Sequence, residues 1–567
     1  MTVDNFPAKE HIASLLENLV RLAADEANVQ EHIIFLQGEH TLSRHDTDRE
    51  LPFHQEANFH YATGCLVPSA TLVIRCSLSA KFDVKLSLPE EDAESSMWSI
   101  PPPNLKQAEQ MFDFTVEELG FTDVDDVAWM ESLAAQNSTK ETLLHVLSAP
   151  ADATYLSYPT LPGWMLNKIA SLPRTIRVTS RFLQKAFHHA RLIKTEQEIS
   201  YIREACRITS GAHEVVMREL GKFAAGRESK LVRAERNGKE VLSEWEIESE
   251  GDAEAVFVAA CRRAGAGQAY LPIVASGSRA STLHYVCNDR VFPTARHPVD
   301  STSAFTASSA DNQRPAGRGC CGSVPSESFN DLAAASGADG TGFLPQVLLI
   351  DAGCEYRGGY ASDITRTIPV GNGGKYTDEG RKVYEIVLKM QKEAEAVCKA
   401  GIHWDDLHFL CHSVLCEEFL KLGIFKNGSV DDLLASGLSQ AFFPHGLGHS
   451  LGLDVHDSLQ FLREEHVDVP ARSLQFSGLF PYLRIRRPLV AGMVLTIEPG
   501  CYFSPQLMER AGVKDSKYVD QEVLARYAAV GGVRIEDVVV VRDDRCENLT
   551  TVPREVEEIE AICSGGR

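Results

Sequence analysis

The sequence lacks long apolar runs, a secretory signal and cysteine pairs with the spacing of a metal knuckle. No apolar stretch reaches the roughly 18 residues of a membrane span, so we expect no membrane association. Residues 1–7 show no basic region followed by an apolar core, which argues against export. The 14 cysteines are expected to act mostly as small buried apolar side chains in a reducing cytoplasm.

Positive charge is also scarce. The chain carries 56 Lys and Arg residues against 79 Asp and Glu residues, giving a net charge of −23 and a pI near 5.3. Because contact with phosphate groups needs a basic face, nucleic acid is not an expected partner. A hydrophobic fraction of 44% supports a large core, and 567 residues exceed the roughly 100–200 residues of one domain, so we expect two domains.

Two aspartates are placed by strand-like segments joined by a turn. The apolar run 347–350 leads into Asp351, and a following glycine permits a backbone turn that exposes its carboxylate. The glycine pair Gly358-Gly359 is typical of a hairpin connection, after which a β-branched segment carries Asp363. The hairpin is expected to bring the two carboxylates together.

Two glutamates and a group of histidines follow similar patterns. An apolar run ends at Glu498, and Glu536 precedes a valine-rich segment. His445, His449 and His456 lie close together in a segment interrupted by glycines. Taken singly, an acidic residue is most often solvated or capping, and a histidine is most often a satisfied polar group. Their joint occurrence favours a common site.

A metal centre explains why these groups would converge. Carboxylates within a few Å of one another raise each other's pKa steeply, so four of them would not all stay charged unaided. Two divalent cations would balance four negative charges, and hard oxygen ligands with a single imidazole suit manganese, cobalt or zinc. The expected ligands are Asp351, Asp363, His449, Glu498 and Glu536.

Five segments resemble the signature segments of the Xaa-Pro aminopeptidase and prolidase group of pita-bread metallopeptidases. They are Asp-Ala-Gly at 351, Ser-Asp-Ile-Thr-Arg-Thr at 362, His-Gly-Leu-Gly-His at 445, Glu-Pro-Gly at 498 and Gly-Gly-Val-Arg-Ile-Glu-Asp at 531. Similar segments at 281–285, 482–487 and 552–559 extend the resemblance over most of the chain.

The resemblance implies a mixed α/β (α+β) architecture. An amino-terminal α/β domain of the creatinase and prolidase type is expected over residues 1–185, followed by a pita-bread catalytic domain over residues 192–567. The catalytic domain would open with a helix, because Thr195 and Glu198 have the spacing of a capping box. Segment 53–64 is similar to an element near the substrate entrance, or by composition alone a buried aromatic strand and turn.

The resemblance also assigns the metal ligands. Asp363 and Glu536 would bridge two divalent ions, expected to be manganese. Asp351 would hold one ion, and His449 with Glu498 would hold the other. Such a metal pair would activate water for amide hydrolysis.

Catalytic roles are implied for three residues. Glu498 would accept the proton of the attacking water and pass it to the leaving nitrogen. His284 and His456 would hydrogen-bond the substrate and the charge that develops in the tetrahedral intermediate. A histidine beside a tyrosine, as in His284-Tyr285, is otherwise read as a hydrogen-bonded core residue.

Substrate binding is expected of His445 at the pocket wall, of Arg484 and of Arg534. Arg484 matches an arginine that in prolidases grips the free carboxylate of a dipeptide, although it could also be a surface cation in the basic run 484–487. Arg534 lies two positions before Glu536, on the same strand face, where it would also orient carboxylates. The implied activity is hydrolysis between an amino-terminal residue and a penultimate proline, by a homodimer.

Two stretches depart from the family. Residues 224–252 are strongly charged, and residues 291–345 are rich in Ser, Ala, Gly and Pro without apolar periodicity. They are expected to be surface inserts or retained intron sequence. The longer stretch lies between His284 and Asp351 and must loop out to leave the site intact. The two aspartates are one residue further apart than is usual in the family, which a bulge in the turn at 357–359 would absorb.

Two other functions remain open. A creatinase-like amidinohydrolase would share the fold, but creatinase lacks these metal ligands. A non-catalytic binding module on the same fold, or an enzyme inactivated by its inserts, is the other alternative. Such modules lose ligands, whereas this chain keeps all five.

Overall fold

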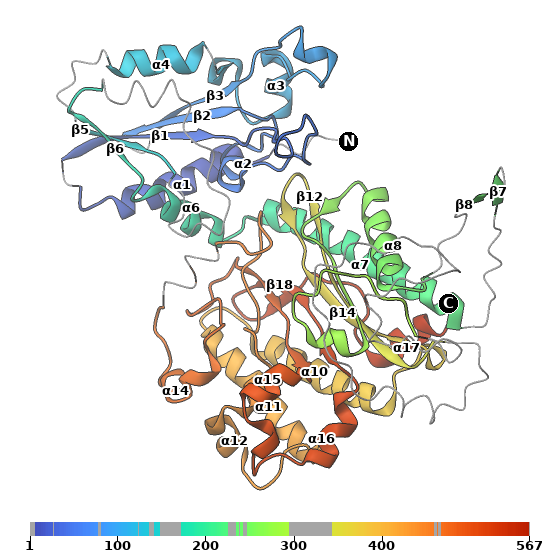
Figure 1. Ribbon diagram of the computed structural model, residues 1–567. Coiled ribbons are helices and arrows are strands. Elements are labelled where there is room, and N and C mark those ends of the chain that lie inside the picture. Colours follow the sequence, from blue (N-terminus) through green and yellow to red (C-terminus); the bar gives the residue numbers. More distant parts are fainter. Residues whose placement is uncertain are drawn as a thin grey trace. The chain divides into compact units, whose positions relative to one another are not determined.

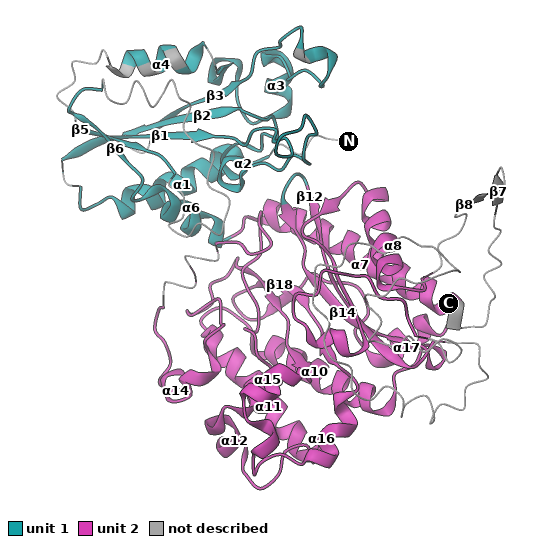
Figure 2. Ribbon diagram, viewed as in Figure 1, with its two compact units in different colours: residues 1–193, 357–359 teal, residues 194–356, 360–567 magenta. Residues whose placement is uncertain are grey.

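A computed structural model describes residues 6–26, 28–77, 81–122, 124–134, 141–147, 172–224, 234–236, 239–241, 247–293, 343–458, 462 and 466–565. The chain forms two compact units, residues 1–193 with 357–359, and residues 194–356 with 360–567 (Figures 1 and 2). Each unit combines helices with β-sheet, as expected for a mixed α/β protein. None of the helices in the described ranges has both the length and the apolar character that a membrane span requires.

A six-stranded mixed sheet forms the centre of the first unit. Its order is β4-β3-β2-β1-β5-β6, with β1–β2 and β2–β3 antiparallel and the other pairs parallel. Both faces of β1 are buried, because Ile33 to Leu36 form a continuous apolar run. The strands are β1 (Val29–Gln37), β2 (Thr71–Ser77), β3 (Phe82–Leu88), β4 (Leu119–Phe121), β5 (Glu141–His145) and β6 (Ile176–Thr179).

Helices cover both faces of this sheet (Figure 1). Trp129 of α4 packs on a cluster that includes Ile33 and Phe35, while α1 packs against α6 and α2. The apolar face of the first helix, which includes Ile12 and Leu19, is buried. The helices are α1 (Ala8–Leu22), α2 (Ala57–Thr63), α3 (Leu105–Met111), α4 (Asp125–Ala134) and α6 (Leu183–Leu192).

Segment 53–64 contains a helix, so the interpretation as a strand is wrong. The Glu56 carboxylate accepts hydrogen bonds from the backbone N–H groups of Asn58 and Phe59 and thereby starts α2. Gly64, with φ of 65°, ends it in the left-handed region. The aromatic side chains are buried as expected, but these two capping residues select the helical conformation.

The second unit consists of two sheet-and-helix halves. In the first half, α7 and α8 pack against the strands, and α17 packs on α7. Its sheets are β10-β11-β14 and β13-β12-β9, all antiparallel. The elements are α7 (Glu196–Ala224), α8 (Glu250–Arg263), α17 (Val556–Cys563), β9 (Gly267–Gln268), β10 (Ile273–Ser276), β11 (Gln346–Ala352), β12 (Cys354–Tyr356), β13 (Tyr360–Ala361) and β14 (Ile364–Val370).

The second half is built on α10. This helix contacts β15, β16 and β17 and carries α11 on its other side. The sheets are β15-β18-β19 and β16-β17, again antiparallel. The elements are α10 (Asp378–Val397), α11 (Trp404–Leu422), α12 (Val430–Ser436), α14 (Ala471–Gln475), α15 (Pro505–Arg510), α16 (Gln521–Ala528), β15 (Val494–Ile497), β16 (Gly500–Tyr502), β17 (Gly532–Arg534), β18 (Asp537–Val541) and β19 (Cys546–Asn548).

The capping box at the start of the second unit is present. The Thr195 N–H donates to Glu198 Oε2 at 2.8 Å, and the Glu198 N–H donates to Thr195 Oγ1 at 3.2 Å. These bonds satisfy two backbone donors that a helix start otherwise leaves free.

Parts of the two stretches expected to be surface inserts belong to the fold, which corrects the bounds of those inserts. Residues 247–252 belong to the fold: Ile247 is buried and α8 begins at Glu250, whose side chain is fully buried. The described part of 225–246 is a small hairpin of β7 (Ala234–Arg236) and β8 (Lys239–Val241). Its other residues lie outside the described ranges.

The described residues on either side of 294–342 lie close together in the second unit. The rings of Phe292 and Phe343 meet edge-to-face with centroids 5.4 Å apart, and the Leu344 N–H donates to the Pro293 carbonyl at 2.8 Å. The apolar side chains at both ends are buried. Residues 294–342 lie outside the described ranges, and the described residues on either side of them are in contact.

Candidate metal centre

The first two candidate ligands come from a hairpin-like excursion between β11 and β14. In the β11–β14 register, Asp351 lies opposite Thr365. A Cβ at Gly353 would lie 1.9 Å from the Ser362 carbonyl oxygen, so glycine is required where the chain turns after Asp351. The turn at 357–359 joins β12 to β13, and the chain then returns through Asp363 into β14.

The turn itself has two residues in the left-handed region, Arg357 with φ of 53° and Gly358 with φ of 80°. The glycine adopts this conformation without strain, whereas an arginine does so at a cost. The extra residue expected in this hairpin can therefore be accommodated within the turn.

The other three candidate ligands lie where the two halves meet. The Glu536 N–H donates to the Thr365 carbonyl, joining the end of β17 to β14. The Thr496 N–H donates to the His449 carbonyl at 2.9 Å, and the Glu498 N–H donates to the Leu447 carbonyl at 2.8 Å. These bonds place His449 beside Glu498.

The five residues converge. The potential ligand atoms of Asp351, Asp363 and Glu536 lie within 4.8 Å of one another, as do those of His449, Glu498 and Glu536. Glu536 is shared by the two groups. The side chains of Glu536 and His449 are each 2% exposed and that of Glu498 is 16% exposed, which makes Glu498 the more open carboxylate.

The hydrogen bonds of His449 show which of its ring nitrogens could bind a cation. His449 Nδ1 lies 3.1 Å from the Ser450 carbonyl, which can only accept, so Nδ1 carries the proton. The Nε2 lone pair then faces Asp363 Oδ2 at 3.2 Å and Glu498 Oε1 at 3.5 Å. Burial holds the pKa of His449 well below its ordinary value, so the ring stays neutral.

Lone pairs that face one another repel unless a cation lies between them. In the described part of the chain, Glu536 Oε1 is buried without any hydrogen-bond partner. Such an atom is costly to bury unless a ligand compensates it. The residues therefore fit divalent cations, and oxygen donors with one imidazole are the set that manganese, cobalt or zinc accept.

The electrostatics agree with this fit. Burial, followed by the charges of Asp351 and Glu498, raises the pKa of Asp363 well above its ordinary value. Burial and Asp363 raise the pKa of Glu536, and burial and Glu536 raise that of Glu498, where the nearby Arg484 guanidinium offsets part of the rise. The carboxylates lack positive charge, which bound cations would supply.

Arg534 and Thr365 hold the carboxylates from one side. Arg534 Nη2 donates to Asp351 Oδ2 at 2.5 Å, and its Nε donates to Thr365 Oγ1 at 3.1 Å. The Thr365 hydroxyl donates in turn to Glu536 Oε2 at 2.6 Å. Arg534 is 4% exposed, so the structure places it among the carboxylates rather than on an open substrate surface.

Tyr270 is a site residue that sequence reasoning missed. Its hydroxyl hydrogen-bonds Asp351 Oδ1 at 2.6 Å and also contacts Asp363 Oδ1. Burial, with the charge of Asp351, holds the pKa of this phenol well above its ordinary value, so it remains a neutral donor. No motif marked Tyr270; its position just before β10, which pairs with β11, was the available signal.

His445 belongs to a hydrogen-bond chain beside Glu498. Its Nδ1 donates to the Gly446 carbonyl at 2.8 Å, so Nε2 accepts from the Tyr502 hydroxyl at 2.8 Å. Tyr502 accepts from Arg534 Nη1 at 2.9 Å. His445 Nδ1 lies 3.9 Å from Glu498 Oε2, which puts the ring at the wall of the site.

The three remaining predicted residues lie on the open side. His456 is exposed, and its ring meets that of His449 edge-to-face at 4.5 Å. His284 is exposed, and desolvation with the guanidinium groups of Arg534 and Arg484 lowers its pKa. Arg484 is half-buried and makes no hydrogen bond or ion pair within the described residues.

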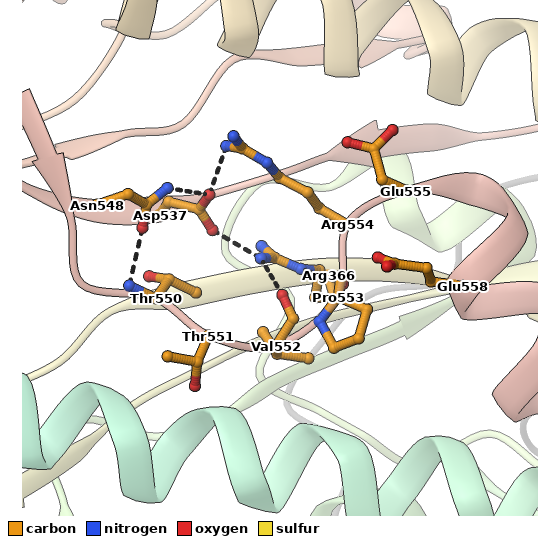
Figure 3. A pocket seen from close by; sticks show the side chains of 10 residues that line it. All are labelled: Arg366, Asp537, Asn548, Thr550, Thr551, Val552, Pro553, Arg554, Glu555 and Glu558. Carbon is orange, nitrogen blue, oxygen red and sulfur yellow. Dashed lines mark hydrogen bonds and ion pairs between the residues drawn. The ribbon is translucent and has the colours of Figure 1, made fainter. Parts of the chain in front are cut away.

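On the face of β14 and β18 that lies opposite the candidate site, side chains form ion pairs. Arg366 Nη2 lies 2.7 Å from Asp537 Oδ1, and Arg554 Nη1 lies 2.8 Å from Asp537 Oδ2. A cavity of about 320 Å³ adjoins this cluster, and Figure 3 shows both arginines directed at Asp537. The arginines beside this cavity are already paired, and among the described residues no side-chain nitrogen or oxygen of its lining is buried without a hydrogen-bond partner as Glu536 Oε1 is.

Comparisons with known proteins agree with this architecture. A model of the aminopeptidase P amino-terminal domain matches residues 9–140, and a model of metallopeptidase family M24 matches residues 200–543. A probable Xaa-Pro aminopeptidase from Tuber melanosporum is 33% identical over 99% of this chain and 97% of its own length. Another from Pyricularia oryzae is 35% identical over 99% and 97%.

Solved structures show the same fold. Proline aminopeptidase P II from Yersinia pestis has a TM-score of 0.65 at 23% identity, over 98% of this chain and 99% of that one. Aminopeptidase P from Escherichia coli with the inhibitor Pro-Leu has a TM-score of 0.64 at 24% identity, over 99% of both chains.

The fold and the convergent carboxylates define a two-domain protein of the metal-dependent hydrolase class. The chain belongs to metallopeptidase family M24. Membership in this family implies divalent metal ions and peptide substrates.

Proposed function

We propose that this protein is an Xaa-Pro aminopeptidase that uses two divalent metal ions, with manganese as the expected metal. The observation that carries the proposal is the pair of three-ligand groups sharing Glu536. It occurs in a chain that matches probable Xaa-Pro aminopeptidases over 99% of its length. Creatinase-like chemistry is disfavoured because a metal-free site would leave Glu536 Oε1 unsatisfied.

The two ligand groups indicate how the ions would be held. Asp351, Asp363 and Glu536 would hold one ion, and His449, Glu498 and Glu536 would hold the other. Asp363 Oδ2 is 3.2 Å from His449 Nε2, so it also reaches the second group. When bound, the ions supply a Lewis acid for the scissile carbonyl and lower the pKa of a water at the site.

Glu498 is the residue that we assign to proton transfer. Of the carboxylates, it is the more exposed, and its Oε2 points toward His445 rather than into the buried group around Asp351. A base must be within hydrogen-bond reach of the proton it accepts, and only an accessible carboxylate meets that condition. Glu498 would then deliver the proton to the leaving proline nitrogen.

His456 and His284 are assigned to the substrate carbonyl and the developing oxyanion. Both rings are exposed on the open side, where a peptide can reach them. Donors of this kind contribute about 3 kcal/mol each in other acyl-transfer sites. His445 would form the wall beside them, held by its hydrogen bond to Tyr502.

Arg534 is assigned to orienting the site rather than to contacting substrate directly. Its guanidinium already donates to Asp351, Thr365 and Tyr502. A guanidinium with these fixed partners sets the angle of the Asp351 carboxylate.

Arg484 is assigned to the carboxylate of a short substrate. Its neighbour Arg486 is committed to a bidentate pair with Asp405, with distances of 2.7 and 2.8 Å. Arg484 has no such partner among the described residues, although its charge acts on Glu498. A half-buried, unpaired guanidinium beside the site suits bidentate capture of a peptide carboxylate.

Hydrolysis of matched peptides tests the proposal. The purified protein is treated with chelator, reloaded with manganese, cobalt or zinc, and given Ala-Pro, Ala-Pro-Ala and Ala-Ala-Ala. We expect release of the first residue from the proline peptides, loss of activity on chelation and recovery on reloading. Equal cleavage of Ala-Ala-Ala would refute the proline specificity. Absence of hydrolysis by the metal-loaded protein would refute the proposal that it is an enzyme.

A further inference from the structure

A buried ion pair is wrapped by the loop of residues 450–457, which follows His449 and carries His456. Lys194 Nζ is 2.8 Å from Asp457 Oδ2, and the two side chains are 2% and 1% exposed. Lys194 is the first residue of the second unit, and its N–H donates to the Gly492 carbonyl at 2.9 Å. Both charges have been removed from water, which is unfavourable unless the geometry of the pair is well fixed.

The pair closes a loop formed by residues 450–457. The Asp457 N–H donates to the Ser450 carbonyl at 2.9 Å, so the two ends of the loop meet. The near end is tied to β15 through the Leu451 N–H and the Val494 carbonyl. His456 precedes Asp457 directly, so the position of one sets that of the other.

Gly452 shows how tightly the loop wraps the ion pair. A Cβ at this position would lie 2.5 Å from Asp457 Oδ2 and 3.0 Å from Lys194 Cε. The Gly452 carbonyl also accepts from the Ala361 N–H, in the strand just before Asp363. The ion pair therefore fills the interior of the loop and leaves no space for a side chain.

His456 depends on this support. Among the described residues, no hydrogen bond holds its exposed ring, which contacts His449 edge-to-face at 4.5 Å. The loop backbone places the Cα and Cβ of His456 and therefore sets which positions its ring can reach. When the loop relaxes, the ring can reach other positions as well.

We propose that Lys194 is a positioning residue: by pairing with Asp457, it holds the 450–457 loop so that His456 faces the substrate. This inference rests on the proposed function, in which His456 contacts the substrate carbonyl. Lys194 itself is buried against Asp457 and Gly452 and acts through Asp457. A displacement of about 1 Å in a group that contacts the reacting atoms lowers a rate by about 100-fold.

The test compares Lys194→Met, Asp457→Asn and the double variant with Lys426→Met. Lys426 also pairs with an aspartate, Asp520 at 3.0 Å, but this pair is solvent-exposed, so it controls for the loss of a lysine. Steady-state kinetics on Ala-Pro-Ala, bound metal by elemental analysis, and hydrogen–deuterium exchange of residues 445–458 are measured for each protein.

We expect both single variants to lose about 10- to 100-fold in kcat, with KM within about threefold of wild type. Exchange should accelerate in 445–458, while bound metal stays at the wild-type level. The double variant should lose no more than the singles, because the two residues act as one unit. Lys426→Met should behave like wild type.

An unchanged kcat in soluble Lys194→Met would overturn the inference. So would faster exchange throughout the second unit with unchanged kcat per folded molecule, since the pair would then act on stability alone. If Lys194→Met does not fold, Gly452→Ala replaces it in the test. This variant crowds the ion pair without removing a charge. We then expect Gly452→Ala and Asp457→Asn to show the same loss of kcat and the same faster exchange.

The exchange measurement separates this inference from the proposed function. If the wild-type protein does not hydrolyse Xaa-Pro peptides, the proposed function fails. Exchange in 445–458 then still decides the structural claim: acceleration in Asp457→Asn supports positioning of the loop by the pair, and exchange equal to wild type refutes it.

Discussion

Truncation of Arg484 to alanine tests substrate recognition with little disturbance of the fold. The guanidinium has no hydrogen bond or ion pair among the described residues, so its removal leaves no protein acceptor unpaired. The cost should therefore fall on the substrate. A hydrogen-bonded pair between charged groups contributes about 1.5–3 kcal/mol, which corresponds to about 10- to 150-fold in kcat/KM.

The assay compares Ala-Pro with its carboxamide, which has nearly the same size and lacks the negative charge. Wild type should prefer the free acid, and Arg484→Ala should lose about 10- to 150-fold more on the acid than on the amide, because the effect of the lost charge on Glu498 is common to both substrates. The difference between the two losses isolates the interaction with the carboxylate. Arg545→Ala, which removes an exposed arginine paired with Asp544, is the control. Equal losses on acid and amide would refute carboxylate capture.

Three further substitutions probe the site and its support. Asp363→Asn should abolish retention of divalent metal, and unchanged metal content by elemental analysis would contradict its assignment. Thr365→Val removes the hydroxyl that donates to Glu536 and should lower the free energy of unfolding by about 1–3 kcal/mol in urea titrations, so an unchanged midpoint would argue against that bond. Arg366→Met leaves buried Asp537 without this partner and should cost about 3–5 kcal/mol by the same measurement, where a cost below about 1 kcal/mol would show that Arg554 suffices.

The candidate ligands could be predicted from the sequence because each has a strong local signal. Asp351 and Glu498 end apolar runs, and Asp363 follows a glycine turn; the structure has strands and a hairpin at these places. In such segments, local patterning and tertiary environment agree, which is the condition under which a sequence is informative.

The supporting residues could not be predicted because their partners are distant in the chain. Tyr270 reaches carboxylates 81 and 93 positions away, and Lys194 pairs with a residue 263 positions away. No periodicity records such pairs. The error at α2 has a local cause, since Glu56 and Gly64 were not recognised as helix caps among buried aromatic residues.

The ends of the longer stretch, residues 291–345, show a third way in which prediction from the sequence can fail. Composition failed as a guide at Phe292, Phe343 and Leu344, which are buried. When composition is averaged over a long polar segment, a few apolar residues at its edge change the average little and are missed. Here those residues are in contact with the other side of the stretch, in the unit where β10 and β11 pair.

Strand alternation links the two faces of the candidate centre. Successive side chains point to opposite faces, so Thr365 and Glu536 face the site while Arg366 and Asp537 face away from it. On the far face, Arg366 donates to Asp537 and to four backbone carbonyls, which uses its full set of five N–H donors.

On the near face, the acceptors outnumber the donors. Arg534 is the arginine bound among the carboxylates, and Glu536 Oε1 still has no donor among the described residues. Because the far face is saturated, relaxation of the strands cannot bring Arg366 across to compensate that oxygen without breaking its own bonds. The carboxylates on the near face therefore keep too few positively charged partners, and this follows from the fold itself. We infer that bound divalent cations, rather than a further side chain, balance their charge.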